Sequence, residues 1–220
     1  MSVMEKRAHL QGRNDELPNQ ELAKQLASTE DRRGIKEIAE NLWSKDKNIQ
    51  SDCIKVLYEI GYIEPELIGA YVPDFIKLLS SGNNRLVWGA MTALSTVAET
   101  NSQEIFENRD KIIRAIESGS VITVDNGIRV LAGVAVANQV YSKKIFPYLI
   151  EHLRRCRPKE VAQHAESILR AVNDKNKKQY MDVLKERQKL LSPAQSARIR
   201  KIFKALESNK LASRVTIEFQ

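Results

Sequence analysis

The sequence predicts an all-α protein, a solenoid of about four to five stacked helical hairpins that repeat every 37 residues. Two ladders of apolar residues support this prediction. The first ladder has steps of 37 residues and a last step of 38, and consists of Leu57, Leu94, Leu131 and Leu169. The second has the same spacing and consists of Leu42, Leu79, Ile116, Leu153 and Leu191. Two ladders in one register indicate a helix pair that buries its apolar faces against the next copy.

The composition fits a protein with a continuous apolar core and no membrane span. Of the 220 residues, 42% are hydrophobic, yet no apolar stretch reaches the roughly 18 residues that a transmembrane helix needs. The N-terminus has no apolar signal region. Cys53 and Cys156 lie far apart without motif spacing, so no disulfide framework is indicated. We therefore expect a cytoplasmic protein that does not insert into membranes.

Charge is distributed unevenly along the chain. Residues 1–110 hold 13 Lys and Arg against 18 Asp and Glu, whereas residues 111–220 hold 22 against 10. The net charge of +7 therefore comes from the C-terminal half. Either this basic half binds a polyanion or an acidic partner, or the charges form the solvated surface that helical repeats usually carry.

A polar N-terminal arm precedes the repeats. Residues 1–16 lack apolar periodicity, so we expect them to be disordered. The solenoid spans residues 17–207 and begins with a partial unit at 17–47, which holds helices near 18–28 and 30–45. The apolar stripe of the second of these helices consists of Ile35, Ile38, Ala39 and Leu42.

The second unit, residues 48–82, contains a proline inside an expected helix. The apolar face of its first helix consists of Cys53, Ile54, Leu57, Ile60 and Gly61. Its second helix follows Pro65, and its apolar face consists of Val72, Phe75, Ile76 and Leu79. Pro73 lies inside this second segment and predicts a kink or a break into two pieces.

The third and fourth units, residues 83–119 and 120–156, repeat this plan. Pro147 lies two periods after Pro73, so we expect the same kink there. Small residues in both units should let neighbouring helices approach closely, and they are Gly89, Ala90, Ala93, Gly127, Ala132 and Gly133.

The repeat pattern decays towards the C-terminus. In the fifth unit, residues 157–191, Arg187 and Gln188 occupy positions that are apolar in earlier units. A last helix over residues 193–207 is expected to cap the stack. Residues 208–220 form a flexible tail, or a short strand that adds to a partner.

The third unit resembles the HEAT-repeat pattern, in which polar turn residues precede a valine and an A-x-x-A-L run. The matching residues are Asn83, Asn84, Val87, Ala90, Ala93 and Leu94. The resemblance to HEAT and armadillo-like families covers roughly residues 30–191, and Trp88 replaces the usual basic residue. It implies a right-handed α-solenoid whose second helices line the concave side. Such proteins bind proteins or nucleic acids and rarely catalyse reactions.

No catalytic, cofactor or metal motif stands out in the sequence. His152 and Cys156 lie four residues apart with His164 nearby, but zinc sites usually have four protein ligands, or three when catalytic. Arg154, Arg155 and Arg157 surround this pair and should repel a cation, so we expect no metal, no cofactor and no enzyme activity.

A minor alternative comes from one column of the repeat. Trp88 and Asp125 occupy equivalent positions in adjacent repeats, with Arg129 one turn beyond. Together they resemble the lesion-binding residues of HEAT-like alkylpurine DNA glycosylases. A surface tryptophan that packs on its neighbour beside an ion pair is the simpler interpretation.

The leading functional hypothesis is a non-catalytic adaptor that binds a protein or peptide in its concave groove. The alternative is a protein that binds the DNA or RNA backbone through its basic C-terminal half. We expect a monomer or weak dimer. The predicted interaction surface consists of Lys77, Lys111, Arg114, Arg154, Arg155, Arg157, Lys159, Lys175, Lys177, Lys178 and Lys189.

Overall fold

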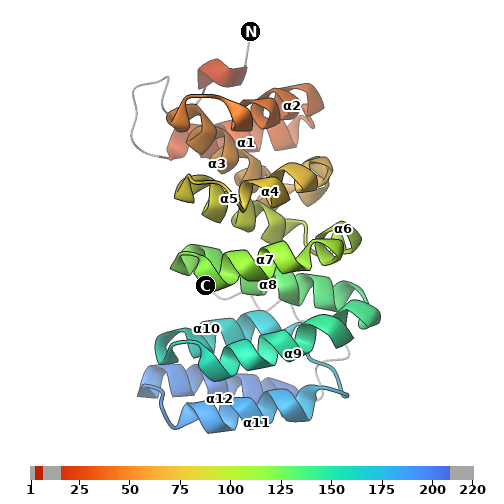
Figure 1. Cartoon of the computed structure of the whole chain (residues 1–220), viewed down its shortest axis with the longest axis vertical. Coiled ribbons are helices and arrows are strands. Elements are labelled where there is room, and N and C mark those ends of the chain that lie inside the picture. The colour runs from red at the N-terminus through yellow and green to blue at the C-terminus, as the bar shows by residue number, and fades with distance from the viewer. Residues whose placement is uncertain (1–2, 7–15, 209–220) are drawn as a thin grey trace.

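The computed structural model describes residues 3–6 and 16–208, and it confirms the all-α repeat solenoid (Figure 1). No strand occurs in these two ranges. One row of helices consists of α1 (Leu17–Ser28), α3 (Lys47–Ile63), α5 (Asn84–Thr96), α8 (Val121–Ala137), α10 (Pro158–Leu169) and α12 (Pro193–Glu207). The other row consists of α2 (Arg32–Glu40), α4 (Val72–Leu78), α7 (Arg109–Ser118), α9 (Gln139–Arg155) and α11 (Lys177–Gln188), with α6 (Ser102–Glu107) preceding α7.

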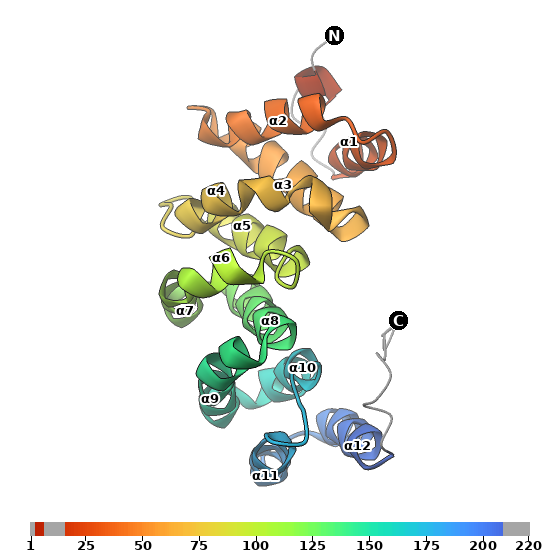
Figure 2. The same ribbon diagram turned by 90° about the vertical axis from the view of Figure 1, so that its right-hand side faces the viewer.

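The stack bends into a C shape, and the two rows lie on opposite sides of it. Figure 2 shows α1, α3, α5, α8, α10 and α12 along the inner side of the bend, and α2, α4, α7, α9 and α11 along the outer side. We call these the inner row and the outer row. The expectation that the second helices line the concave side is therefore wrong, because the first helix of each pair forms the inner row.

Small residues between successive inner helices account for the direction of the bend. A Cβ atom added to Gly89 of α5 would lie 2.7 Å from Cγ1 of Ile54 in α3, and one added to Gly133 of α8 would lie 2.8 Å from Cβ of Ala98, just after α5. Because such contacts leave no room for a side chain, the inner helices approach closely. Closer spacing on one side of a stack bends it towards that side.

The two apolar ladders form the core between the rows. The first ladder lies on the inner helices, where Leu57, Leu94 and Leu131 are fully buried. The second ladder follows the outer row, with Leu42 and Leu153 fully buried and Leu79 and Ile116 nearly so. The residues that recur with the repeat period therefore form one continuous core, as predicted from the sequence.

Side-chain caps fix the start of several helices. The side chain of Asn83 accepts a hydrogen bond from the backbone N–H of Arg85 at 3.1 Å, as expected for a helix that begins at residue 84. The side chain of Asn138 accepts one from the backbone N–H of Val140 at 2.7 Å and separates α8 from α9. These two caps fix the first residues of α5 and α9.

The two internal prolines have different effects. At Pro73 the expected break occurs, since short 3-10 turns at Pro65–Leu67 and Gly69–Tyr71 precede α4. At Pro147 the helix is not divided into two pieces, because α9 runs without interruption from Gln139 to Arg155, and the kink expected there stays a prediction. Pro147 is exposed, so water can bind the carbonyl that loses its helical N–H partner.

The ends of the chain also differ in part from expectation. Within the arm expected to be disordered, Val3–Lys6 forms a turn of 3-10 helix, and Val3 and Met4 pack against the core. Residues 7–15 and the tail from 209 onwards lie outside the described residues. Near the other end, Arg187 of α11 donates hydrogen bonds to the carbonyls of Arg154 and Cys156. The polar substitution in the fifth unit thus caps the C-terminal end of α9.

Candidate functional site

An aromatic patch lies on the inner row where α3 meets α5. It consists of Tyr58, Tyr62 and Trp88. The ring of Tyr58 lies edge-on to that of Tyr62, at a centroid distance of 6.1 Å, and 6.0 Å from that of Trp88. Tyr62 is 55% exposed and Trp88 is half-buried. Helix α5 contacts α3, α8 and α4 on its other sides, so its remaining exposed surface faces the inner side.

Lys55 contacts the Tyr58 ring of this patch. Its Nζ lies 2.7 Å from a carboxylate oxygen of Glu16 and 2.7 Å from one of Glu59, and 4.8 Å from the ring centroid of Tyr58. Burial alone would lower the pKa of Lys55, but the two carboxylates raise it above its usual value. The lysine is therefore a paired, largely buried cation that holds the Tyr58 ring in place.

Arg129 of α8 extends the patch to the next repeat. Burial raises the pKa of Tyr62, while the nearby positive charge of Arg129 opposes this increase. Arg129 is exposed, and its described contact is a long one, 3.5 Å from Nη1 to Oδ1 of Asn126. Asn126 in turn donates to the hydroxyl of Thr92 at 3.0 Å and ties α8 to α5. A fixed aromatic surface thus lies beside an available guanidinium group.

The predicted basic surface does not form one face. Most of its members lie on or next to outer helices, whereas Arg157 and Lys159 lie at the start of α10 in the inner row. Lys175 precedes α11. The outer members are Lys77 on α4, Lys111 and Arg114 on α7, Arg154 and Arg155 on α9, Lys177 and Lys178 on α11, and Lys189 after α11.

Several of these charges already have partners. Arg154 and Arg155 both contact Glu151, and Arg157 forms an ion pair with Glu160. Local pairing of this kind reduces the positive potential that a phosphate backbone would meet.

Three further members contact neutral groups. Lys77 lies over the ring of Trp43 with its Nζ 4.4 Å from the centroid. Lys111 donates to the side chain of Asn108 at 3.0 Å, and Lys177 donates to the carbonyl of Leu206 at 2.5 Å. The other members of the predicted surface, all among the described residues, are Arg114, Lys159, Lys175, Lys178 and Lys189, and their side chains make no hydrogen bond or ion pair with described residues.

A pocket of about 380 Å³ lies between the ends of α8 and α10 and the start of α9. Lys175 of the predicted surface lines it, together with Val136 and Arg170. Arg170 forms an ion pair with Glu99, which follows α5. The pocket therefore lies next to a contact that links the third and fifth units.

Trp88 and Asp125 have different partners. Trp88 packs on Tyr58, whereas Oδ1 of Asp125 lies 2.8 Å from Nε2 of His164. Burial alone would raise the pKa of Asp125, but the hydrogen bond from His164 and the charge of Arg129 lower it. The column that resembled a glycosylase site is thus divided between an aromatic patch and a histidine network.

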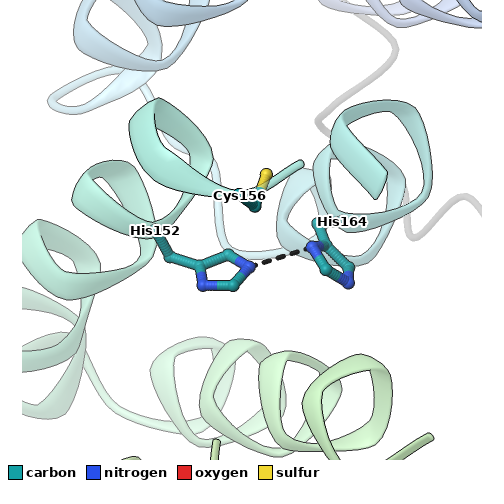
Figure 3. A group of neighbouring side chains, drawn as sticks. All are labelled: His152, Cys156 and His164. Carbon is teal, nitrogen blue, oxygen red and sulfur yellow. Dashed lines mark hydrogen bonds between the residues drawn. The ribbon is translucent and has the colours of Figure 1, made fainter. Parts of the chain in front are cut away.

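The structure also brings together a cluster that sequence spacing left in doubt. His152 Nε2 lies 2.9 Å from His164 Nδ1, and Cys156 lies beside them, one helical turn after His152 (Figure 3). Burial, together with the neighbouring His164, lowers the pKa of His152 to about 4, and burial raises the pKa of Cys156 to about 11. His164 is fully buried.

Solved structures with the same architecture include designed and natural repeat proteins. An engineered protein aligns over 94% of this chain and 98% of its own, with 18% identity and a TM-score of 0.66. A designed armadillo repeat protein in complex with the peptide (KR)4 aligns over 84% of this chain and 85% of its own, with 14% identity and a TM-score of 0.65. This chain has a HEAT/armadillo-like repeat fold.

Kap121p is a third similar structure. It aligns over 88% of this chain but only 22% of its own, with 15% identity and a TM-score of 0.62. A structure of Kap121p bound to Pho4p aligns over 90% of this chain, with a TM-score of 0.54. No protein-family model matches the chain, and no curated protein matches it in sequence. At these identities the likeness shows the fold alone.

None of the helices within residues 3–6 and 16–208 combines the length and hydropathy required to cross a membrane.

Proposed function

We propose that this protein is a non-catalytic scaffold that binds a protein or peptide segment on its inner row, with the aromatic patch as the main contact. The observation that carries this proposal is the exposed surface of Tyr62 and Trp88 beside Arg129. Tyrosine, tryptophan and arginine are the residues most enriched among those that dominate binding energy at protein interfaces.

The arrangement of the patch favours a polypeptide partner. Tyr58 and Lys55 are buried, so the ring of Tyr62 and the half-buried ring of Trp88 are held in place before a partner arrives. A prearranged surface loses less conformational entropy on binding. The designed armadillo protein and Kap121p, which share this fold, were solved with a peptide and with a protein respectively.

The alternative of a nucleic-acid ligand has weaker support. The basic residues lie on both rows, and Arg154, Arg155 and Arg157 are paired with glutamates. A continuous positive track would be needed to follow a phosphate backbone. Recovery of nucleic acid alone is one possible outcome of the experiment below.

The test is in-cell crosslinking and pull-down with the full-length chain, followed by affinity measurement with each recovered partner. Trp88→Ala and Tyr62→Ala should each weaken capture, by about 2 kcal/mol or roughly thirtyfold for a dominant contact. Trp43→Ala is a matched control, because Trp43 is 44% exposed on the 3-10 turn after α2, next to Lys77 of the outer row. It should leave binding unchanged.

Two results would refute the proposal. In the first, Trp88→Ala and Tyr62→Ala capture the partner normally, whereas Trp43→Ala does not. That result would place the partner on the outer row. The other is recovery of nucleic acid alone, with a mobility shift that weakens with salt and with reversal of the charges of Arg114, Lys159 and Lys178.

A further inference from the structure

A cluster of two histidines and one cysteine joins α9 to α10, away from the aromatic patch. One ring nitrogen of His152, one ring nitrogen of His164 and the Sγ atom of Cys156 all lie within 4.8 Å of one another (Figure 3). His152 and Cys156 come from the last turn of α9 and the residue that follows it, and His164 comes from the middle of α10. The helix pair therefore brings three possible ligands to one point.

Asp125 fixes which nitrogen of His164 faces this point. Oδ1 of Asp125 lies 2.8 Å from Nε2 of His164. A carboxylate oxygen accepts a hydrogen bond, so Nε2 donates it and carries the ring proton. In the neutral ring the other nitrogen, Nδ1, then has the lone pair, and it lies 2.9 Å from Nε2 of His152. Metal-binding histidines are usually oriented by such a carboxylate.

We propose that His152, Cys156 and His164 bind one Zn²⁺ ion, with Asp125 as the residue that orients His164. Two nitrogens and one thiolate are a typical ligand set for zinc, and a solvent molecule would complete a tetrahedral shell. The Zn–N bonds of about 2.0–2.1 Å and Zn–S bonds of about 2.3 Å place tetrahedral ligand atoms roughly 3.3–3.6 Å apart. The observed separations, from 2.9 Å to 4.8 Å, reach these values with side-chain shifts on the order of 1 Å.

The arginines that were expected to repel a cation have other partners. Arg154 and Arg155 contact Glu151, and Arg157 contacts Glu160, so their charges are locally compensated. Arg187 donates its hydrogen bonds to the carbonyls of Arg154 and Cys156 at the end of α9. The charged groups near His152 include two carboxylates, those of Glu160 and Asp125.

The ion would link three helices. His152 and Cys156 fix the end of α9, His164 fixes α10, and the hydrogen bond to Asp125 connects the site to α8 in the preceding unit. The cluster lies where the repeat pattern begins to decay, so a bound ion would stabilise the junction between the regular units and the C-terminal cap. This role is independent of the aromatic patch.

The test uses the full-length chain, freed of metal with a chelator, and titrates it with Zn²⁺ in a calorimeter. We expect one ion per chain. Co²⁺ as a spectroscopic substitute should give a thiolate-to-cobalt charge-transfer band and a tetrahedral visible spectrum. Cys156→Ser should remove the charge-transfer band, and His152→Gln should weaken Zn²⁺ binding at least tenfold. Asp125→Asn should weaken it roughly 10–100-fold while keeping the charge-transfer band.

Matched controls separate ligation from folding. Cys53→Ser and His9→Gln alter the other cysteine and the remaining histidine, and should leave stoichiometry and the cobalt spectrum unchanged. Circular dichroism checks that each variant is folded. The proposal is overturned if the folded, metal-free chain binds no Zn²⁺ stoichiometrically. It is also overturned if Cys156→Ser and His152→Gln bind Zn²⁺ as well as the unaltered chain does, and the network then has a purely structural role.

Discussion

Replacing Gly133 with alanine tests whether close packing of the inner row stabilises the bend. The added Cβ would lie 2.8 Å from Cβ of Ala98, whereas carbon atoms in contact prefer about 3.5–4.0 Å. Both methyl groups are attached directly to the backbone, so no rotamer change can relieve the overlap. The two segments have to move apart by roughly 1 Å.

The expected loss of stability follows from two opposing contributions. Overpacking of this kind costs about 1–3 kcal/mol. The higher helix propensity of alanine offsets about 1 kcal/mol. A 2.8 Å contact with an atom that cannot move belongs to the upper part of this range of costs. We therefore expect the free energy of unfolding to fall by about 1–2 kcal/mol in total. For a chain of this length that corresponds to roughly 2–8 °C in the melting temperature.

Urea denaturation followed by circular dichroism measures this loss, and two other glycines serve as comparisons. Gly82 has no neighbouring atom within 4 Å of an added Cβ, so Gly82→Ala should be neutral or stabilise by up to about 1 kcal/mol. Gly89→Ala meets Cγ1 and Cγ2 of the buried, β-branched Ile54, which has little freedom to rotate, so it should also destabilise the protein. If Gly133→Ala proved as stable as Gly82→Ala, the explanation of the bend by close packing would be wrong.

Three further experiments test contacts near the C-terminal end of the stack. Tyr180→Phe removes a buried 2.6 Å hydrogen bond to the carbonyl of Ala165, and should cost about 1–3 kcal/mol in urea denaturation. Arg187→Met removes the donor to the carbonyls of Arg154 and Cys156 at the end of α9, and should cost a similar free energy, seen as a lower melting temperature. A double-mutant cycle on Arg198 and Glu166, which join α12 to α10, should give a coupling of at most about 1 kcal/mol, because Arg198 is half-exposed. A coupling well above that would mean the pair is shielded from solvent.

The fold could be predicted from the sequence because the repeat is encoded locally in every unit. Leu57, Leu94 and Leu131 are each buried by their own helix pair and the next one, so the period directly reports the core. The side of the bend is a different property. It depends on whether successive first helices or successive second helices pack more closely. Gly89 and Gly133, which both lie on first helices, are the residues that indicate the closer packing.

The candidate sites were harder to predict because they depend on contacts between repeats. His164 and Asp125 are 39 residues apart, two residues more than one period, so the column that paired Asp125 with Trp88 missed its actual partner. The aromatic patch was missed for another reason. Tyr58 and Tyr62 lie one helical turn apart on α3, and this spacing could have indicated a shared face. An aromatic content of only 6% did not indicate that a third ring, from the next repeat, would join them.

The aromatic patch and the metal cluster can be tested independently, because they involve different residues and different repeats. The patch lies on α3 and α5, while the cluster joins α9 to α10. Substitutions at sites without shared contacts are usually additive. Trp88→Ala should therefore leave Zn²⁺ affinity unchanged, and Cys156→Ser should leave partner capture unchanged. If loss of the metal also abolished capture, the ion would have to influence the inner row through Asp125 and α8, the helix that also carries Arg129.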